Sequence, residues 1–193
     1  MNPANLVTTL RLLLIPFVLI GIWRYDNDAE EIWRIIAILA AIVASLTDSI
    51  DGYVARRFNY VSKIGAIYDP IVDKIGCVAA IIMLAIARNS FEPVAFWYPS
   101  VIIAKELIMT VGAILLRKKA PPKGFKPLVF GKISAFLQAA TIIWLLLKAP
   151  HGYIIITISG AVAFLAGVAY IYLGISLIYG VGTWGKQPLK AEK

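Results

Sequence analysis

The sequence has almost none of the residues that support thiol or imidazole chemistry. Its 193 residues include one cysteine, Cys77, inside an apolar run, and one histidine, His151, in a short polar break beside Pro150. A single cysteine cannot form an internal disulfide, and thiolate metal sites need several cysteines. We therefore expect no disulfide, no thiolate metal site and no catalytic histidine.

Charged residues are also scarce, and they are mostly of one sign. Only 16% of residues are charged, with 19 basic against 11 acidic, whereas 60% are hydrophobic and the mean hydropathy is +0.81. This composition lies outside the soluble globular class. The net charge of +8 could indicate a nucleic-acid partner, but most cations lie between long apolar runs. That pattern is typical of a membrane protein with basic cytoplasmic loops, so we expect a lipid bilayer and no nucleic acid as partner.

Apolar runs long enough to cross a bilayer, about 20 residues each, occur six times. The N-terminus has no basic cluster before its apolar run and no small-residue cleavage site soon after it, which indicates a retained membrane segment and not a signal peptide. No internal repeat is evident. We predict an all-α integral membrane protein, a single domain over 1–193, with six transmembrane helices: 6–24, 32–57, 63–87, 94–117, 129–148 and 152–181.

The basic residues are distributed unevenly between the two sets of predicted helix ends. Eleven fall at one set of ends and four at the other. Because basic residues are enriched in cytoplasmic loops, both termini and the 56–63 and 117–128 loops are predicted to lie on the cytoplasmic side of a cell (inner) membrane. The other four basic residues fall at membrane depth, and they are Arg11, Lys74, Lys105 and Lys132. Glu106 falls at membrane depth as well.

Four aspartates lie in the second and third predicted spans, around the cytoplasmic turn. Asp48 and Asp51 are three residues apart, and Asp69 and Asp73 are four apart, so each pair shares one face of a helix. An antiparallel hairpin would bring all four to one depth, as an intramembrane site open to the cytoplasm. Four carboxylates this close repel one another, and bound cations would neutralise the repulsion. All-oxygen ligands favour Mg²⁺, with Mn²⁺ possible, and four carboxylates suit two ions.

The aspartates belong to a longer pattern, D-x2-D-G-x2-A-R-x8-G-x3-D-x3-D, with eight specified positions in 26 residues. The pattern resembles the signature of the CDP-alcohol phosphotransferase family, and the opening segment is similar to that family's N-terminus. The resemblance implies transfer of a phosphatidyl group from CDP-diacylglycerol to an alcohol, with release of CMP, often by a homodimer. It implies that all four aspartates bind metal, that Asp73 is also the general base, and that the CDP part of the donor contacts Asn5, Thr8, Asp48, Asp51, Gly52, Ala55, Arg56 and Gly65.

Basic residues predicted within the membrane spans indicate which kind of alcohol the protein accepts. Lys105 and Lys132 need anionic partners, and we expect them to bind a phosphate on the acceptor, with Arg11 at the same subsite; Glu106 is the alternative partner for either lysine. The chain most resembles family members that accept sn-glycerol 3-phosphate and make phosphatidylglycerophosphate, although Lys105 and Ala113 stand where those members often carry arginine. Phosphatidylglycerol, as used to make cardiolipin, and inositol phosphate remain alternative acceptors. A carrier of cations or protons is the alternative from another class, because intramembrane acids also mark ion pathways.

Overall fold

The computed structural model describes residues 3–25, 31–58, 65–87, 91–119 and 129–179, with side chains described for 12–25, 31–47, 74–87, 91–112 and 130–176. Over these ranges the chain forms six helices and short turns, and it contains no strand. The helices are α1 (Pro3–Arg24), α2 (Glu31–Phe58), α3 (Gly65–Ile86), α4 (Trp97–Lys119), α5 (Val129–Leu146) and α6 (Gly152–Tyr179). The helices predicted from the sequence are therefore confirmed, and their ends differ from the prediction by at most three residues.

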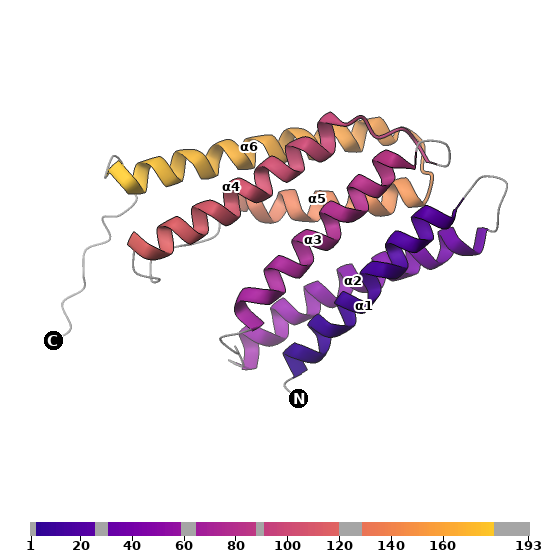
Figure 1. Ribbon diagram of the computed structural model, residues 1–193, viewed down its shortest axis with the longest axis horizontal. Coiled ribbons are helices and arrows are strands. Elements are labelled where there is room, and N and C mark those ends of the chain that lie inside the picture. The colour runs from indigo at the N-terminus through magenta and orange to yellow at the C-terminus, as the bar shows by residue number, and fades with distance from the viewer. Residues whose placement is uncertain (1–2, 26–30, 59–64, 88–90, 120–128, 180–193) are drawn as a thin grey trace.

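The helices form two groups of three. α1 packs against α2 and α3, and α6 packs against α4 and α5; contacts of α5 with α2 and α3, and of α3 with α4, join the groups. In Figure 1 the two groups lie close together at the right and diverge toward the left. Successive helices run in opposite directions, so the end of α2 and the start of α3 lie together at the lower left end of the first group.

Small residues let the helices of the first group approach closely. A Cβ added to Gly21 on α1 would lie 2.7 Å from the carbonyl oxygen of Trp33 and 2.8 Å from the Cβ of Ala37, both on α2. On the other side of α1, a Cβ added to Gly76 of α3 would lie 2.7 Å from Ile15. Such contacts favour helix association in membranes, where packing substitutes for the hydrophobic effect. α1 thus holds α2 and α3, the helices that carry the aspartates.

A carboxylate fixes the start of α6. Glu92, which precedes α4, accepts hydrogen bonds from the backbone N–H groups of Gly152 (2.7 Å) and Tyr153 (3.1 Å). These amides have no partner within their own helix, and a negative charge at a helix N-terminus is stabilising. The preceding turn contains two residues with positive φ, Lys148 at 52° and His151 at 62°. The turn and the cap together join α4, α5 and α6 at one end of the structure.

Every helix exposes apolar side chains within the described residues. Each helix exposes at least one large hydrophobic side chain, and Phe136 on α5 is 73% exposed. Within the described residues, one helical segment is long and apolar enough by itself to cross a bilayer, Gly152–Ser176 in α6, and shorter apolar segments lie in α1, α3 and α5. The structure therefore bears out the helical class and is consistent with a membrane protein.

Candidate functional site

The four aspartates lie on two successive helices that both pack against α1. Asp48 and Asp51 are in the last turns of α2, and Asp69 and Asp73 are in the first turns of α3. At 1.5 Å per residue, Asp51 is about 10 Å and Asp48 about 15 Å from the end of α2; Asp69 is about 6 Å and Asp73 about 12 Å from the start of α3. Their backbone positions place the four residues at similar depths. Their side chains lie outside the described residues, so their convergence stays a prediction.

The side chains of the other predicted donor-binding residues are also outside the described set, although their backbones belong to the described helices. These residues are Asn5, Thr8, Gly52, Ala55, Arg56 and Gly65. The side chain of Arg11 is outside the described set as well. Their helices are α1, α2 and α3, which pack as one group. The fold therefore gathers the segments that the sequence assigns to donor and metal binding.

A buried charge cluster lies next to this group. Lys105 on α4 is only 2% exposed, and its Nζ lies 2.5 Å from Oε1 of Glu106. The other carboxylate oxygen of Glu106 lies 2.9 Å from Nζ of Lys74 on α3, and Lys74 also donates a 3.4 Å hydrogen bond to Thr110. One carboxylate is thus shared by two ammonium groups. Because Lys74 follows Asp73 in the chain, the cluster lies at the depth of the second aspartate pair.

The charge cluster continues into polar side chains on α5. Lys105 donates a hydrogen bond of 3.3 Å to the hydroxyl of Ser134, which also accepts one of 3.1 Å from Gln138. Ser134 and Gln138 are buried, as is Thr141 further along the same face. A buried ammonium group is tolerated only when its donors are satisfied. The contacts with Glu106 and Ser134 explain how Lys105 remains in the interior of an otherwise apolar protein.

Lys132 lies elsewhere on α5. Its side chain is exposed, and it is two residues, or about 200° of helix rotation, away from Ser134. The structure therefore brings Lys105 to Glu106 and Lys74 and does not bring Lys132 to the same contacts. The expectation that Lys132 binds the acceptor stays a prediction.

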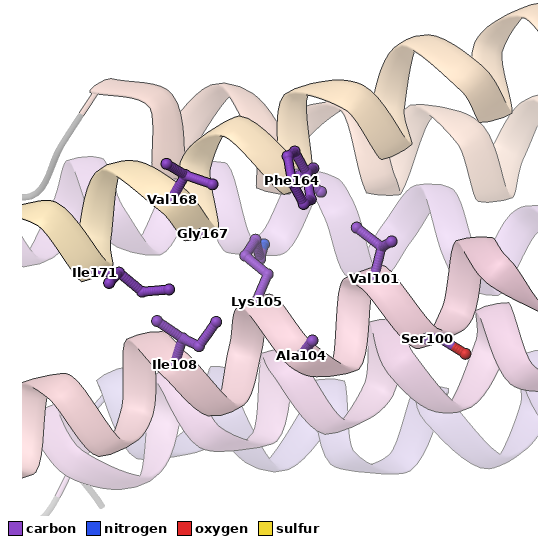
Figure 2. Close-up of a pocket in the computed structure, with 10 residues that line it drawn as sticks. Ser100, Val101, Ala104, Lys105, Ile108, Phe164, Gly167, Val168 and Ile171 are labelled. Atoms are coloured by element: carbon purple, nitrogen blue, oxygen red, sulfur yellow. The ribbon is translucent and has the colours of Figure 1, made fainter.

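The stem of Lys105 forms part of the floor of a groove between α4 and α6 (Figure 2). The groove has a volume of about 290 Å³, and the residues beside Lys105 are small or apolar, including Ala104, Phe164 and Gly167. A Cβ on Gly167 would lie 3.9 Å from the Lys105 stem. Lys105 therefore presents its methylenes to an apolar groove and its ammonium group to the polar side chain of Ser134 on α5.

The cluster carries an excess of positive charge. Lys74, Lys105 and Glu106 sum to one net positive charge in a largely buried cluster, and buried ions are costly unless they are paired. An anionic ligand would complete the pairing. Among the residues with described side chains, no group of three or more histidine, cysteine, aspartate or glutamate residues could hold a metal ion. The aspartate motif, which the sequence predicts to hold the metal ions, has its side chains outside that set.

Sequence analysis missed two parts of this cluster. It gave no partner to Lys74 and no role to Ser134 or Gln138. The spacing of Ser134 and Gln138, four residues apart in a predicted span, is a signal that could have been read as a polar face. For Lys105, the structure shows the alternative partner that the sequence offered, Glu106.

Comparisons with known proteins agree with the aspartate pattern. Residues 1–176 match the model of the family described as CDP-alcohol phosphatidyltransferase. A Wigglesworthia glossinidia brevipalpis protein named CDP-diacylglycerol--glycerol-3-phosphate 3-phosphatidyltransferase is 31% identical over 181 residues, which cover 90% of this chain and 94% of the relative. A Bacillus subtilis protein of the same name is 32% identical over 117 residues, covering 56% of this chain and 58% of the relative.

A further relative from Mycobacterium tuberculosis, named probable phosphatidylglycerophosphate synthase, is 32% identical over 142 residues. That match covers 73% of this chain and spans 64% of the length of the relative.

Proposed function

Since the chain belongs to the CDP-alcohol phosphatidyltransferase family, we propose that it transfers the phosphatidyl group of CDP-diacylglycerol to sn-glycerol 3-phosphate, forming phosphatidylglycerophosphate and CMP. The observation that carries this proposal is the complete aspartate pattern, Asp48 to Asp73, within the matched residues 1–176. The names of the relatives support the choice of reaction and acceptor.

The family depends on divalent metal ions. We propose two Mg²⁺ ions, with Mn²⁺ as a substitute, held by Asp48, Asp51, Asp69 and Asp73. The donor set fits these ions, because it offers only carboxylate oxygens and comes from two helices that both pack against α1. When bound, two divalent ions neutralise a pyrophosphate and stabilise the charge of a departing phosphate.

The residues of the chain supply binding and proton transfer. Arg56, at the water boundary, forms bidentate bonds with a donor phosphate. Gly52 and Gly65, which have no side chains, leave room for the nucleotide against the backbone. Asp73 takes the proton of the acceptor hydroxyl while the hydroxyl oxygen forms a bond to the phosphorus of the phosphatidyl group. The bond between that phosphorus and the CMP oxygen breaks, and CMP leaves with the bonding electrons.

The acceptor phosphate is assigned to Lys105, with Arg11 and Lys132 as further candidates. Lys105 is supported by the net positive charge of its cluster and by its closeness to Lys74, the residue after Asp73. The ammonium groups of the cluster draw in a dianionic phosphate more strongly than a neutral alcohol such as serine. Of the three, Lys105 is the candidate whose described contacts link it to the aspartate-bearing helix.

We also propose that all six helices span an inner membrane, with the termini and the active site on the cytoplasmic side. The shortest helix, with 18 residues, is about 27 Å long, close to the roughly 30 Å thickness of a hydrocarbon core. Large apolar side chains are exposed on every helix. Four of the five tryptophans lie near the helix ends opposite the aspartates, as in an interfacial aromatic belt: Trp23, Trp33, Trp97 and Trp144.

Homodimerisation, implied by the family resemblance, is part of the same proposal.

Charged side chains explain why several helices are less apolar than α6, since α2 and α3 carry the aspartates and α4 carries Lys105 and Glu106. In a bundle these side chains face other helices or a polar cavity and not lipid.

An acceptor screen tests the proposed function. The full-length protein, purified in detergent, is incubated with radiolabelled CDP-diacylglycerol and one acceptor at a time: glycerol 3-phosphate, phosphatidylglycerol, inositol phosphate or serine. We expect CMP release and lipid product with glycerol 3-phosphate only, loss of both with EDTA, and recovery with Mg²⁺ or Mn²⁺. Product with phosphatidylglycerol alone would make the protein a cardiolipin-forming member. Metal-independent release, or ion flux in liposomes without CMP, would overturn the proposal.

A further inference from the structure

Glu106 has no role in the reaction described above, yet its carboxylate is the centre of the buried charge cluster. We propose that Glu106 is a positioning residue, which ties Lys74 of α3 to Lys105 of α4 and thereby sets how α3 presents Asp69 and Asp73. This inference rests on the proposed function, because it assigns metal ligands to α3.

The contacts of Glu106 divide between two helices. Its Oε1 pairs with Lys105 at 2.5 Å and its Oε2 with Lys74 at 2.9 Å, and its side chain is only 13% exposed. Both lysines have a second contact, Lys105 with Ser134 on α5 and Lys74 with Thr110 on α4. The carboxylate is therefore held from both sides, and through it three helices are connected.

The bridge lies where α3 has few packing contacts with the neighbouring helices α4 and α5. α3 has a smaller interface with α4 or α5 than α1 has with α2, so few packing contacts restrain α3 on that side. A buried carboxylate between two ammonium groups resists displacement, because moving either lysine leaves an unpaired charge in a medium of low dielectric constant. Glu106 thus supplies a restraint that apolar packing alone provides weakly.

Helix geometry links this restraint to the aspartates. Lys74 directly follows Asp73, about 100° round the helix, and Asp69 lies one turn before Asp73 on the same face. Holding Lys74 against α4 therefore fixes the rotation of α3 about its axis. The same rotation determines the face on which Asp69 and Asp73 lie.

The restraint needs the charge of Glu106 as well as its shape. In Glu106→Gln the amide is nearly the same size, but the two ammonium groups lose their shared counterion and repel each other. Lys74 is the more exposed of the two, at 30%, so it is the one free to move toward water. We expect α3 to rotate and the aspartates to lose their alignment.

The test compares Glu106→Gln, Lys74→Met and the double variant in the full-length protein. Glu31→Gln is the matched control, because it removes a carboxylate from the Glu31–Arg34 ion pair at the opposite end of α2. The affinity for Mn²⁺ is measured by electron paramagnetic resonance without substrate, and kcat and the KM for glycerol 3-phosphate are measured with Mg²⁺. Wild-type protein in the same assays separates failure of the proposed function, seen as absence of turnover or Mn²⁺ binding, from failure of this inference.

Residues that orient metal ligands typically affect metal affinity or activity by 10- to 100-fold. We expect Mn²⁺ affinity and kcat to fall at least about 10-fold in both single variants, with little change in the acceptor KM and no larger effect in the double variant, since all three break one bridge. Glu106→Asp should recover part of kcat. Wild-type Mn²⁺ affinity and kcat in folded Lys74→Met would overturn the proposal even if Glu106→Gln does not fold. Additive losses, or an increase in acceptor KM alone, would also overturn it.

Discussion

Replacing Lys105 with methionine tests the assignment of the acceptor phosphate. The side chain is 2% exposed, and methionine matches much of its length and its apolar stem. The surroundings should survive the change, because Glu106 keeps Lys74 at 2.9 Å and Ser134 keeps Gln138 at 3.1 Å. Lys105→Met therefore removes the ammonium group without leaving a buried carboxylate unpaired.

The expected effect follows from the lost contact with phosphate. A hydrogen bond to a charged group contributes about 1.5–3 kcal/mol. Because each 1.4 kcal/mol corresponds to a factor of ten, the KM for glycerol 3-phosphate should rise about 10- to 150-fold. The KM for CDP-diacylglycerol should change little, since Lys105 is not assigned to the donor.

The assay measures CMP release while each substrate is varied in turn. Lys148→Met is the matched control: it removes the same charge at the far end of the bundle, where Lys148 lies 4.8 Å from the ring centre of Tyr25. An increase in acceptor KM of less than about threefold, or about 0.65 kcal/mol, in a folded Lys105→Met protein would refute the assignment. Equal increases in both KM values would do so as well.

Three further predictions concern the metal site and the packing. Asp69→Asn should abolish turnover while the protein still elutes as a folded species by size exclusion, and substantial residual activity would argue against a ligand role. Gly21→Ala should lower the free energy of unfolding by about 1–3 kcal/mol, because the new methyl group meets the backbone oxygen of Trp33; Gly112→Ala, with no atom within 4 Å, is the control in a thermal unfolding assay. Glu92→Ala should cost about 0.5–2 kcal/mol in the same assay by uncapping α6, and an unchanged melting temperature would contradict this.

Sequence reasoning recovered the helices because their determinants are local. Long apolar runs separated by proline, charge and polar residues define where each helix begins and ends, and a helix satisfies its own backbone hydrogen bonds within an apolar environment. The proposed site was likewise found through spacing within two adjacent helices. Asp48 and Asp51, or Asp69 and Asp73, need only helical geometry to share a face.

The partners of the buried lysines could not be derived in this way. Depth along a helix can be counted from the sequence, but the direction in which a side chain points depends on the rotation of each helix against its neighbours. Lys105 and Lys132 were grouped because the sequence predicts both at membrane depth. The structure separates them, with Lys105 buried against Glu106 and Ser134 and Lys132 exposed on another face of α5.

The sequence by itself determined the helical class, the limits of the six helices and the acidic pattern of the family, since all of these depend on residues that are close in the chain. Only the tertiary structure decided that Glu106 joins Lys74 to Lys105, residues 31 positions apart. That contact depends on how α3, α4 and α5 are rotated and packed, and packing is a property of the whole bundle.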